Sequence, residues 1–444
     1  MQFPARFAVS FLFCFLCAGR LAGQTFTFTT LAGSTGGTND GANAAAQFYF
    51  PGDIAVDNQG NLFVADTSNN TIRKVTPVVD DWVVTTIAGV PTMGGAGGTN
   101  DGVNGEAQFF HPEGIVVDGS GNLFVVDHDN NTIRQLIHNG TDWSVTTIAG
   151  SAGLRASVDG TNSDVRFWGP RGIARDNGGN FYITDASTHI IRKMVQIGTN
   201  WVVTTIAGLA ANFSLADGTN SSARFNFPFS LAVDSNTNIF VADFGNNAIR
   251  KIRPIGTNWV VTTIAGNGTT GSTDGTNLQA RFNSPAGVAL DTDGNVYVTD
   301  QFNNTLRKIT PIGTNWVVST IGGVALVSGA NNGLGTNAHF FRPWGLAVDA
   351  QKRLLIVDHS NHTIREGVPT SSAPPTLKIA RTDAQVLLSW PLAASSFVVE
   401  SSPTLSASAA WTRMTNGVVI SGNYFWLTNA SGTQAFYRLH GAGP

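Results

Sequence analysis

The sequence is poor in charged residues and has no basic cluster. Asp, Glu, Lys and Arg make up 12% of the 444 residues, and the formal net charge is −3. An ordinary globular domain has about 25% charged residues. Since no run of Lys and Arg is present, the chain lacks the positive surface that binds nucleic-acid phosphates. We therefore expect no nucleic-acid partner.

Cysteine is almost absent, and both copies, Cys14 and Cys17, lie near the N-terminus. Residues 1–23 combine a positive charge, an apolar run and a tail of small residues, as in a secretory signal peptide. The apolar run is too short to span a membrane. Cleavage would leave a mature protein without disulfides. A lipid anchor on Cys17 is the alternative, which the bulky residues before it disfavour.

A long repeat dominates the rest of the chain. Each copy holds three short apolar runs separated by tight turns rich in Gly, Asn and Asp, and five copies continue into a fourth run led by Trp. Four strands per unit, repeated six times, are typical of an all-β propeller. The copies begin at six regularly spaced prolines: Pro51, Pro112, Pro170, Pro228, Pro285 and Pro343.

The first copy reads "FPGDIAVDNQGNLFVADTSNNTIRKV", and its pattern resembles that of NHL-repeat propellers of the exported bacterial type. The resemblance covers residues 25 to about 367. Related six-bladed propellers include amidating lyases and gluconolactonase-like hydrolases, which hold a metal on the axis with His, Asp, Asn or Glu from the inner strands. No inner-strand run of this chain carries a His, which disfavours zinc and leaves calcium open.

The sixth copy ends without a fourth run, while the chain opens with a strand-like stretch, "TFTFTTLAG", at residues 25–33. This stretch matches the fourth run of the other copies. We therefore predict that it forms the outer strand of the sixth blade and closes the ring, which removes an open sheet edge.

The composition changes after the last copy. A Pro- and Ser-rich segment, residues 368–375, reads as a linker. Residues 376–444 break the repeat and contain several short strand-like runs, and they weakly resemble the fibronectin-like C-terminal modules of exported bacterial proteins. The predicted organisation is a signal peptide at 1–23, a propeller at 24–367, the linker, and a small β-sandwich at 376–444.

Residue types that recur in every copy are most simply explained as parts of a blade. The Asp and Arg of each copy, first Asp66 and Arg73, belong to this group. The Asp-Gly loops, first at Asp40, lack the dense alternating ligands of a calcium loop. An Asp-Gly turn that leads to a Phe between the blades is the simpler interpretation.

Positions that differ between copies are better candidates for a site. Strand direction places the Pro-x-Gly loops and the Asp-x-x-Asn-Asn loops on one face of the ring, here called the variable face. Loops near the axis of such a face are where propellers usually bind ligands. Five candidates would surround the mouth of the central channel, and three more would lie in or around it. They are Asp53, Glu113, Arg171, Phe229 and Trp344 at the mouth, with His128, His359 and Arg175.

This mixture of charged and aromatic residues suits a polar ligand with an apolar face, such as a sugar or a peptide. The alternative is that these are unrelated surface residues. Arg175 replaces an aliphatic residue of the other inner strands, so it lines the channel, extends its charge to solvent or pairs with a nearby carboxylate.

The sequence has no Ser-His-Asp arrangement, phosphate-binding Gly loop or CxxC motif. We therefore expect an exported recognition or scaffold protein, extracellular, cell-surface or periplasmic. It would be a monomer without a membrane span or cofactor, and it would bind a protein, peptide or glycan. The alternative function is a calcium-dependent lactonase- or lyase-like hydrolase with its site on the axis. No catalytic residue or metal ligand is assigned.

Overall fold

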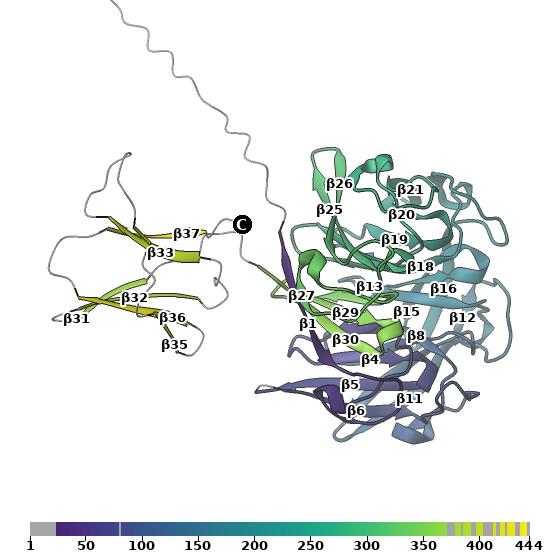
Figure 1. Ribbon diagram of the computed structural model, residues 1–444. Coiled ribbons are helices and arrows are strands. Elements are labelled where there is room, and N and C mark those ends of the chain that lie inside the picture. The colour runs from purple at the N-terminus through teal and green to yellow at the C-terminus, as the bar shows by residue number, and fades with distance from the viewer. Residues whose placement is uncertain are drawn as a thin grey trace, which may run out of the picture. The chain divides into compact units, whose positions relative to one another are not determined.

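The computed structural model describes residues 24–79 and 81–370, and the backbone of the strands between 378 and 441. Thr25–Thr370 form one compact unit, and the strands that follow belong to a second. The first unit is a propeller of six blades (Figure 1). The predicted signal peptide, residues 1–23, and the linker from residue 371 onward lie outside the described residues.

Each blade is a five-stranded antiparallel sheet. From the outer edge to the axis, blade 1 contains β2 (Gly41–Ala42), β6 (Asp81–Gly89), β5 (Thr71–Val78), β4 (Leu62–Asp66) and β3 (Ile54–Val56). Blade 2 contains β7 (Gly102–Val103), β11 (Asp142–Gly150), β10 (Thr132–Asn139), β9 (Leu123–Asp127) and β8 (Pro112–Val117). Blade 3 contains β12 (Gly160–Thr161), β16 (Asn200–Ala207), β15 (Ile190–Ile197), β14 (Phe181–Asp185) and β13 (Pro170–Arg175).

The second half of the ring repeats this order. Blade 4 contains β17 (Gly218–Thr219), β21 (Asn258–Ala265), β20 (Ala248–Ile255), β19 (Ile239–Asp243) and β18 (Pro228–Val233). Blade 5 contains β22 (Gly275–Thr276), β26 (Asn315–Gly322), β25 (Thr305–Ile312), β24 (Val296–Asp300) and β23 (Pro285–Leu290). Blade 6 contains β27 (Gly333–Leu334), β1 (Phe26–Ala32), β30 (Thr363–Pro369), β29 (Leu354–Asp358) and β28 (Leu346–Val348).

The helical elements of the described residues are 3-10 turns of three residues, which connect the strands. They are η1 (Asn43–Ala45), η2 (Thr67–Asn69), η3 (Asn104–Glu106), η4 (Asn162–Asp164), η5 (Ala186–Thr188), η6 (Asn220–Ser222), η7 (Phe244–Asn246), η8 (Asn277–Gln279), η9 (Gln301–Asn303), η10 (Gly335–Asn337) and η11 (His359–Asn361). No helix in this part of the chain has the length and apolar character needed to cross a membrane.

The opening strand β1 completes blade 6, as predicted. It pairs antiparallel with β30, so that Phe28 lies opposite Gly367. Phe26 and Phe28 are fully buried, and the Phe28 ring makes an edge contact with Phe340 at 5.3 Å between centroids. The alternating Phe residues of the opening stretch therefore form the buried side of an outer strand, which joins the two ends of the ring.

The sequence pattern predicts four strands per blade, and the structure adds a fifth of two residues. In blade 1 this strand, β2, follows Asp40, whose Oδ1 accepts a hydrogen bond from Arg73 at 2.8 Å. The other oxygen, Oδ2, accepts the backbone N–H of Thr86 on β6 at 3.0 Å. The Asp-Gly loop is thus tied to the outer strand, and its carboxylate is occupied by protein donors.

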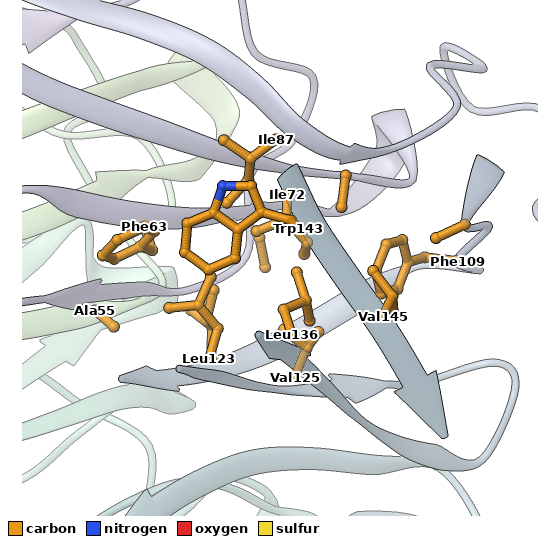
Figure 2. Close-up of a cluster of buried hydrophobic side chains, with 14 residues drawn as sticks. Ala55, Phe63, Ile72, Ile87, Phe109, Leu123, Val125, Leu136, Trp143 and Val145 are labelled. Carbon is orange, nitrogen blue, oxygen red and sulfur yellow. The ribbon is translucent and has the colours of Figure 1, made fainter. Parts of the chain in front are cut away.

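The core lies between neighbouring blades. Figure 2 shows the cluster of blades 1 and 2, in which Phe63 of β4 and Trp143 of β11 pack with aliphatic side chains. The recurring Asp and Arg form a buried ion pair inside each blade, as in Asp66 and Arg73 at 2.7 Å. The carboxylate also accepts the backbone N–H of Tyr49. The Asp and Arg that recur in every copy of the repeat therefore stabilise the blade.

The inner strands of neighbouring blades approach each other closely at the Pro-x-Gly loops. A Cβ atom added to Gly345 would lie 2.5 Å from the Cα of Asp53 in the next blade. The Gly345 N–H donates to the carbonyl of Gly52 at 2.9 Å. Glycine at this point lets the last and first blades meet at the axis.

The second unit contains two antiparallel sheets. One has the order β31 (Lys378–Thr382), β32 (Gln385–Pro391), β36 (Tyr424–Ala430), β35 (Val418–Ser421), and the other β34 (Thr412–Arg413), β33 (Phe397–Ser402), β37 (Phe436–Gly441). The strands agree with an all-β module. Its resemblance to a fibronectin-like sandwich remains a prediction.

Candidate functional site

Five of the predicted residues meet at the axis on the variable face. Asp53, Glu113, Arg171, Phe229 and Trp344 line a cavity of about 20 Å³, together with the glycines of the Pro-x-Gly loops. A cavity of this size has room for about one water molecule. We call these five residues the mouth. A ligand larger than water would have to lie across the mouth.

The charged centre of the mouth is an ion pair between neighbouring blades. Nη1 of Arg171 contacts both carboxylate oxygens of Glu113, at 2.7 and 2.6 Å. The Arg171 guanidinium also lies 4.3 Å from the centre of the Phe229 ring and 5.9 Å from that of Trp344. Its Nε is buried and has no hydrogen-bond partner among the described residues. The pair is electrically neutral and is held against aromatic faces.

Asp53 is the other acid of the mouth, and within the described residues no basic group pairs with it. Its Oδ2 accepts the backbone N–H of Ile115 at 3.3 Å. Burial raises the pKa of Asp53 to about 7, and the negative charge of Glu113 adds to this effect. The carboxyl group therefore changes charge near neutral pH.

Aromatic rings extend from the mouth over blades 4, 5 and 6 and reach blade 1. The Trp344 ring lies 5.0 Å from Phe229 and 4.2 Å from His359. Each further ring contacts its neighbour, and the outermost, Phe302, is 40% exposed. We call this set the aromatic arc. Its members are Phe302, Phe244, Phe229, Trp344, His359 and Phe50.

The two predicted histidines join blades to each other. Nδ1 of His128 donates to the carbonyl of Pro170 at 2.9 Å, and Nδ1 of His359 donates to that of Pro51 at 2.8 Å. A carbonyl oxygen only accepts, so Nδ1 carries the proton in both rings. Thr67 makes the equivalent bond to Pro112. In these three blades, the residue after the strand-end Asp thus donates a hydrogen bond that joins its blade to the next. Only the outer parts of the two imidazole rings remain for contact with a ligand.

A second polar pair lies beside the mouth. Nδ1 of His111 lies 2.6 Å from Asp129. This hydrogen bond raises the pKa of His111 and lowers that of Asp129. Nε2 of His128 lies 3.6 Å from Asp129 and 3.9 Å from Glu113. Polar groups therefore run from the mouth to the rim of blade 2. His111 precedes the proline in this copy alone, which made it a candidate for the surroundings of the mouth, whereas nothing in the sequence marked Asp129.

Arg175 does not lie with the other predicted residues. It ends β13 at the side of the ring opposite Pro170, next to the turn that contains Gly179. The cavity at the mouth does not include it. Arg175 therefore does not belong to the mouth, because the inner strand carries its last residue away from the variable face.

No group of three or more His, Cys, Asp or Glu side chains in the described part of the chain is arranged to hold a metal ion. The mouth and the aromatic arc offer a neutral ion pair, the titratable carboxyl of Asp53 and an aromatic surface. Together these groups can hold a ligand by stacking and hydrogen bonds.

Comparison with known sequences identifies the repeat. The family described as "NHL repeat" matches residues 48–75 in blade 1 and 282–308 in blade 5. The chain contains NHL repeats and folds as a six-bladed β-propeller.

Two curated relatives of this NHL-repeat propeller match over most of its length. Protein SUPPRESSOR OF QUENCHING 1, chloroplastic, from Arabidopsis thaliana is 25% identical over 74% of this chain and 31% of its own length. NHL repeat-containing protein 2 from Bos taurus is 27% identical over 71% of this chain and 46% of its own length. The NHL-repeat propeller thus spans less than half the length of these relatives.

Among solved structures, an auxiliary nutrient binding protein from Bacteroides thetaiotaomicron is similar with a TM-score of 0.58 and 15% sequence identity. The match covers 78% of the NHL-repeat chain and 77% of the other. This likeness concerns the fold.

Proposed function

We propose that this NHL-repeat propeller is an exported recognition protein that binds a peptide or glycan across the mouth of its variable face. The observation that carries the proposal is the contact of the Arg171–Glu113 ion pair with the aromatic arc. A neutral charged pair beside stacked rings offers both hydrogen bonds and an apolar surface to the same ligand.

The size of the cavity limits how a ligand binds. About 20 Å³ admits a water molecule, so the ligand would lie on the rim with its apolar face on Trp344. A polar group of the ligand would then reach the remaining donors of Arg171 and the carboxyl of Asp53. Binding would depend on the rings for affinity and on the charged groups for orientation.

The comparison with solved structures agrees with a binding role. The Bacteroides protein of similar fold is described as an auxiliary nutrient binding protein. Propellers host many functions, so the fold alone does not assign this one. The proposal rests on the residues of the variable face.

The proposal is tested by screening the chain from Gln24 onward against peptide and glycan arrays, followed by Trp344→Ala. We expect a hit whose affinity falls at least about tenfold in the variant, since stacked rings dominate such sites. Phe213→Ala, at a ring that is 61% exposed in an outer loop, is the matched control and should bind normally. A hit that binds Trp344→Ala as well as the parent contradicts the mouth assignment.

A further inference from the structure

A larger cavity lies on the other side of the ring, between blades 1 and 2. Its volume is about 280 Å³. Small-molecule sites range from about 300 to about 1,000 Å³, so this cavity is close to the lower limit. It is lined by the turns after β3 and β8, by Lys74 and Phe63 of blade 1, and by His138 and Trp143 of blade 2. We call it the far-face groove.

Two other blade junctions contain the same kind of residues but arrange them differently. Between blades 3 and 4, the Lys193 ammonium lies 5.9 Å from the ring of Trp259 and 6.0 Å from that of Tyr182. Between blades 4 and 5, Lys251 covers Trp316 and Phe240 at 5.4 and 5.3 Å. In both junctions a lysine from the third strand lies over two rings.

At the far-face groove, the corresponding lysine, Lys74, makes no such contact with the rings of Phe63 and Trp143. Phe63 and Trp143 are 5.9 Å apart and lie together in the cluster of Figure 2. Lys74 lines the cavity, and among the described residues its ammonium has no cation–π contact, hydrogen bond or ion pair. Within the part of the chain that the structure describes, this ring pair therefore lacks the lysine contact found at the other two junctions.

The residue opposite the tryptophan also differs at this junction. His138 stands opposite Trp143 in the β10–β11 pairing, and its ring lies 4.7 Å from the indole. In blades 4 and 5 a proline, Pro254 or Pro311, stands opposite the corresponding tryptophan. The imidazole therefore stands beside Trp143 where blades 4 and 5 have a proline ring.

The charges of the groove disfavour an anionic ligand. Asp57 and Asp118 each accept a backbone N–H and a side-chain amide from their own turns. Two carboxylates against one ammonium repel an anion. The groups left for a ligand are the Lys74 ammonium, the imidazole of His138, and the amides and hydroxyl of Asn58, Gln59 and Ser120. Such donors and acceptors match the hydroxyl groups of a sugar.

We propose that the far-face groove binds one residue of a neutral saccharide. The site is separate from the mouth, because its residues belong to the other side of blades 1 and 2, and it does not depend on the proposed function. The volume fits one sugar ring better than a chain, so a longer saccharide would continue into solvent.

The test uses the chain from Gln24 onward with neutral tetrasaccharides of β-1,4-glucose, β-1,4-xylose and α-1,4-glucose, measured by calorimetry. An oligogalacturonate serves as the acidic comparison. We expect one neutral saccharide to bind, and Lys74→Ala to weaken it about tenfold through loss of a charge-assisted hydrogen bond. Lys251→Ala is the matched control in the covered junction. Lys251→Ala and Trp344→Ala should both bind normally, which separates this site from the mouth.

A second variant tests the cause of the open groove. His138→Pro restores the residue of blades 4 and 5 and should let Lys74 cover the rings, so binding is lost while the melting temperature stays unchanged. The proposal is overturned if no neutral saccharide binds, if the acidic one binds better, or if Lys74→Ala and His138→Pro bind like the parent chain.

Discussion

Nδ1 of His359 in the last blade donates a hydrogen bond of 2.8 Å to the carbonyl of Pro51 in the first. This bond lies at the inner side of the ring closure, whereas β1 joins the same two ends at the outer side. The closure of the propeller thus has a polar contact near the axis and an apolar strand at the rim.

The inner contact should make stability depend on pH. Burial lowers the pKa of His359 to about 4, below the value of about 6.5 in an unfolded chain. A lowered pKa means that the neutral form stabilises the fold. This contribution is complete above about pH 6.5 and is lost as pH falls towards 4.

His359→Gln removes this titration. At pH 7.5 the parent chain should be more stable than the variant by about 1–3 kcal/mol, and the difference should shrink as the pH falls to 4.5. Thermal unfolding at several pH values measures it. A difference that is constant with pH would show that His359 does not titrate in this range. His138→Gln, at an exposed site, is the control.

The pairing of β1 with β30 predicts that removal of the opening strand lowers the stability of the propeller strongly. Deletion of residues 25–33 removes β1 and leaves an open edge on β30, so the whole propeller should melt at a lower temperature. Phe28→Ala should alone cost about 3–5 kcal/mol, because the ring is fully buried. Thr27→Ala, at an exposed site of the same strand, should change stability by less than about 0.5 kcal/mol. An unchanged melting temperature for the deletion would contradict closure by this strand.

The strand β1 also shows what could be predicted from the sequence. Its alternating Phe26 and Phe28 match the outer strands of the repeat, so pattern and counting were sufficient to place it. The two-residue strand β2 is too short to produce a pattern. It depends on the carboxylate of Asp40, which reaches a partner 46 residues later.

The sequence predicted where the five residues of the mouth lie but not how they pair with one another. Strand direction placed Asp53 and Trp344 at one opening. The contact of Glu113 with Arg171 joins residues 58 positions apart in different blades, and the sequence contains nothing that links them. Strand direction could have excluded Arg175, because it ends the strand that Pro170 begins.

The ion pair of the mouth predicts non-additive effects of substitution. Arg171→Gln leaves the carboxylate of Glu113 buried without its partner and should cost about 2–4 kcal/mol. Combining it with Glu113→Gln removes the unpaired charge, so the double variant should be more stable than the sum of the single effects implies. Urea unfolding of the four chains measures the coupling. Additive effects would show that the two groups do not interact in solution.

Titration of Asp53 should change the stability of the fold with pH in the opposite direction to titration of His359. Its pKa is raised to about 7, above the value of about 3.9 for an unfolded chain. Ionisation of Asp53 therefore opposes folding, with a cost that grows from about pH 4 and is complete above pH 7.

Asp53→Asn keeps an oxygen that can accept the N–H of Ile115 but cannot ionise. The variant should be more stable than the parent chain at pH 8, by up to about 4 kcal/mol, and equal to it near pH 4. Thermal unfolding across this range measures the effect. Asp293→Asn is the control, because this carboxylate is 60% exposed and pairs with Lys352 at the surface. If Asp53→Asn is instead less stable at pH 8, the ionised carboxylate has a stabilising partner. That result would place a cation at the mouth and would change the class of ligand expected there.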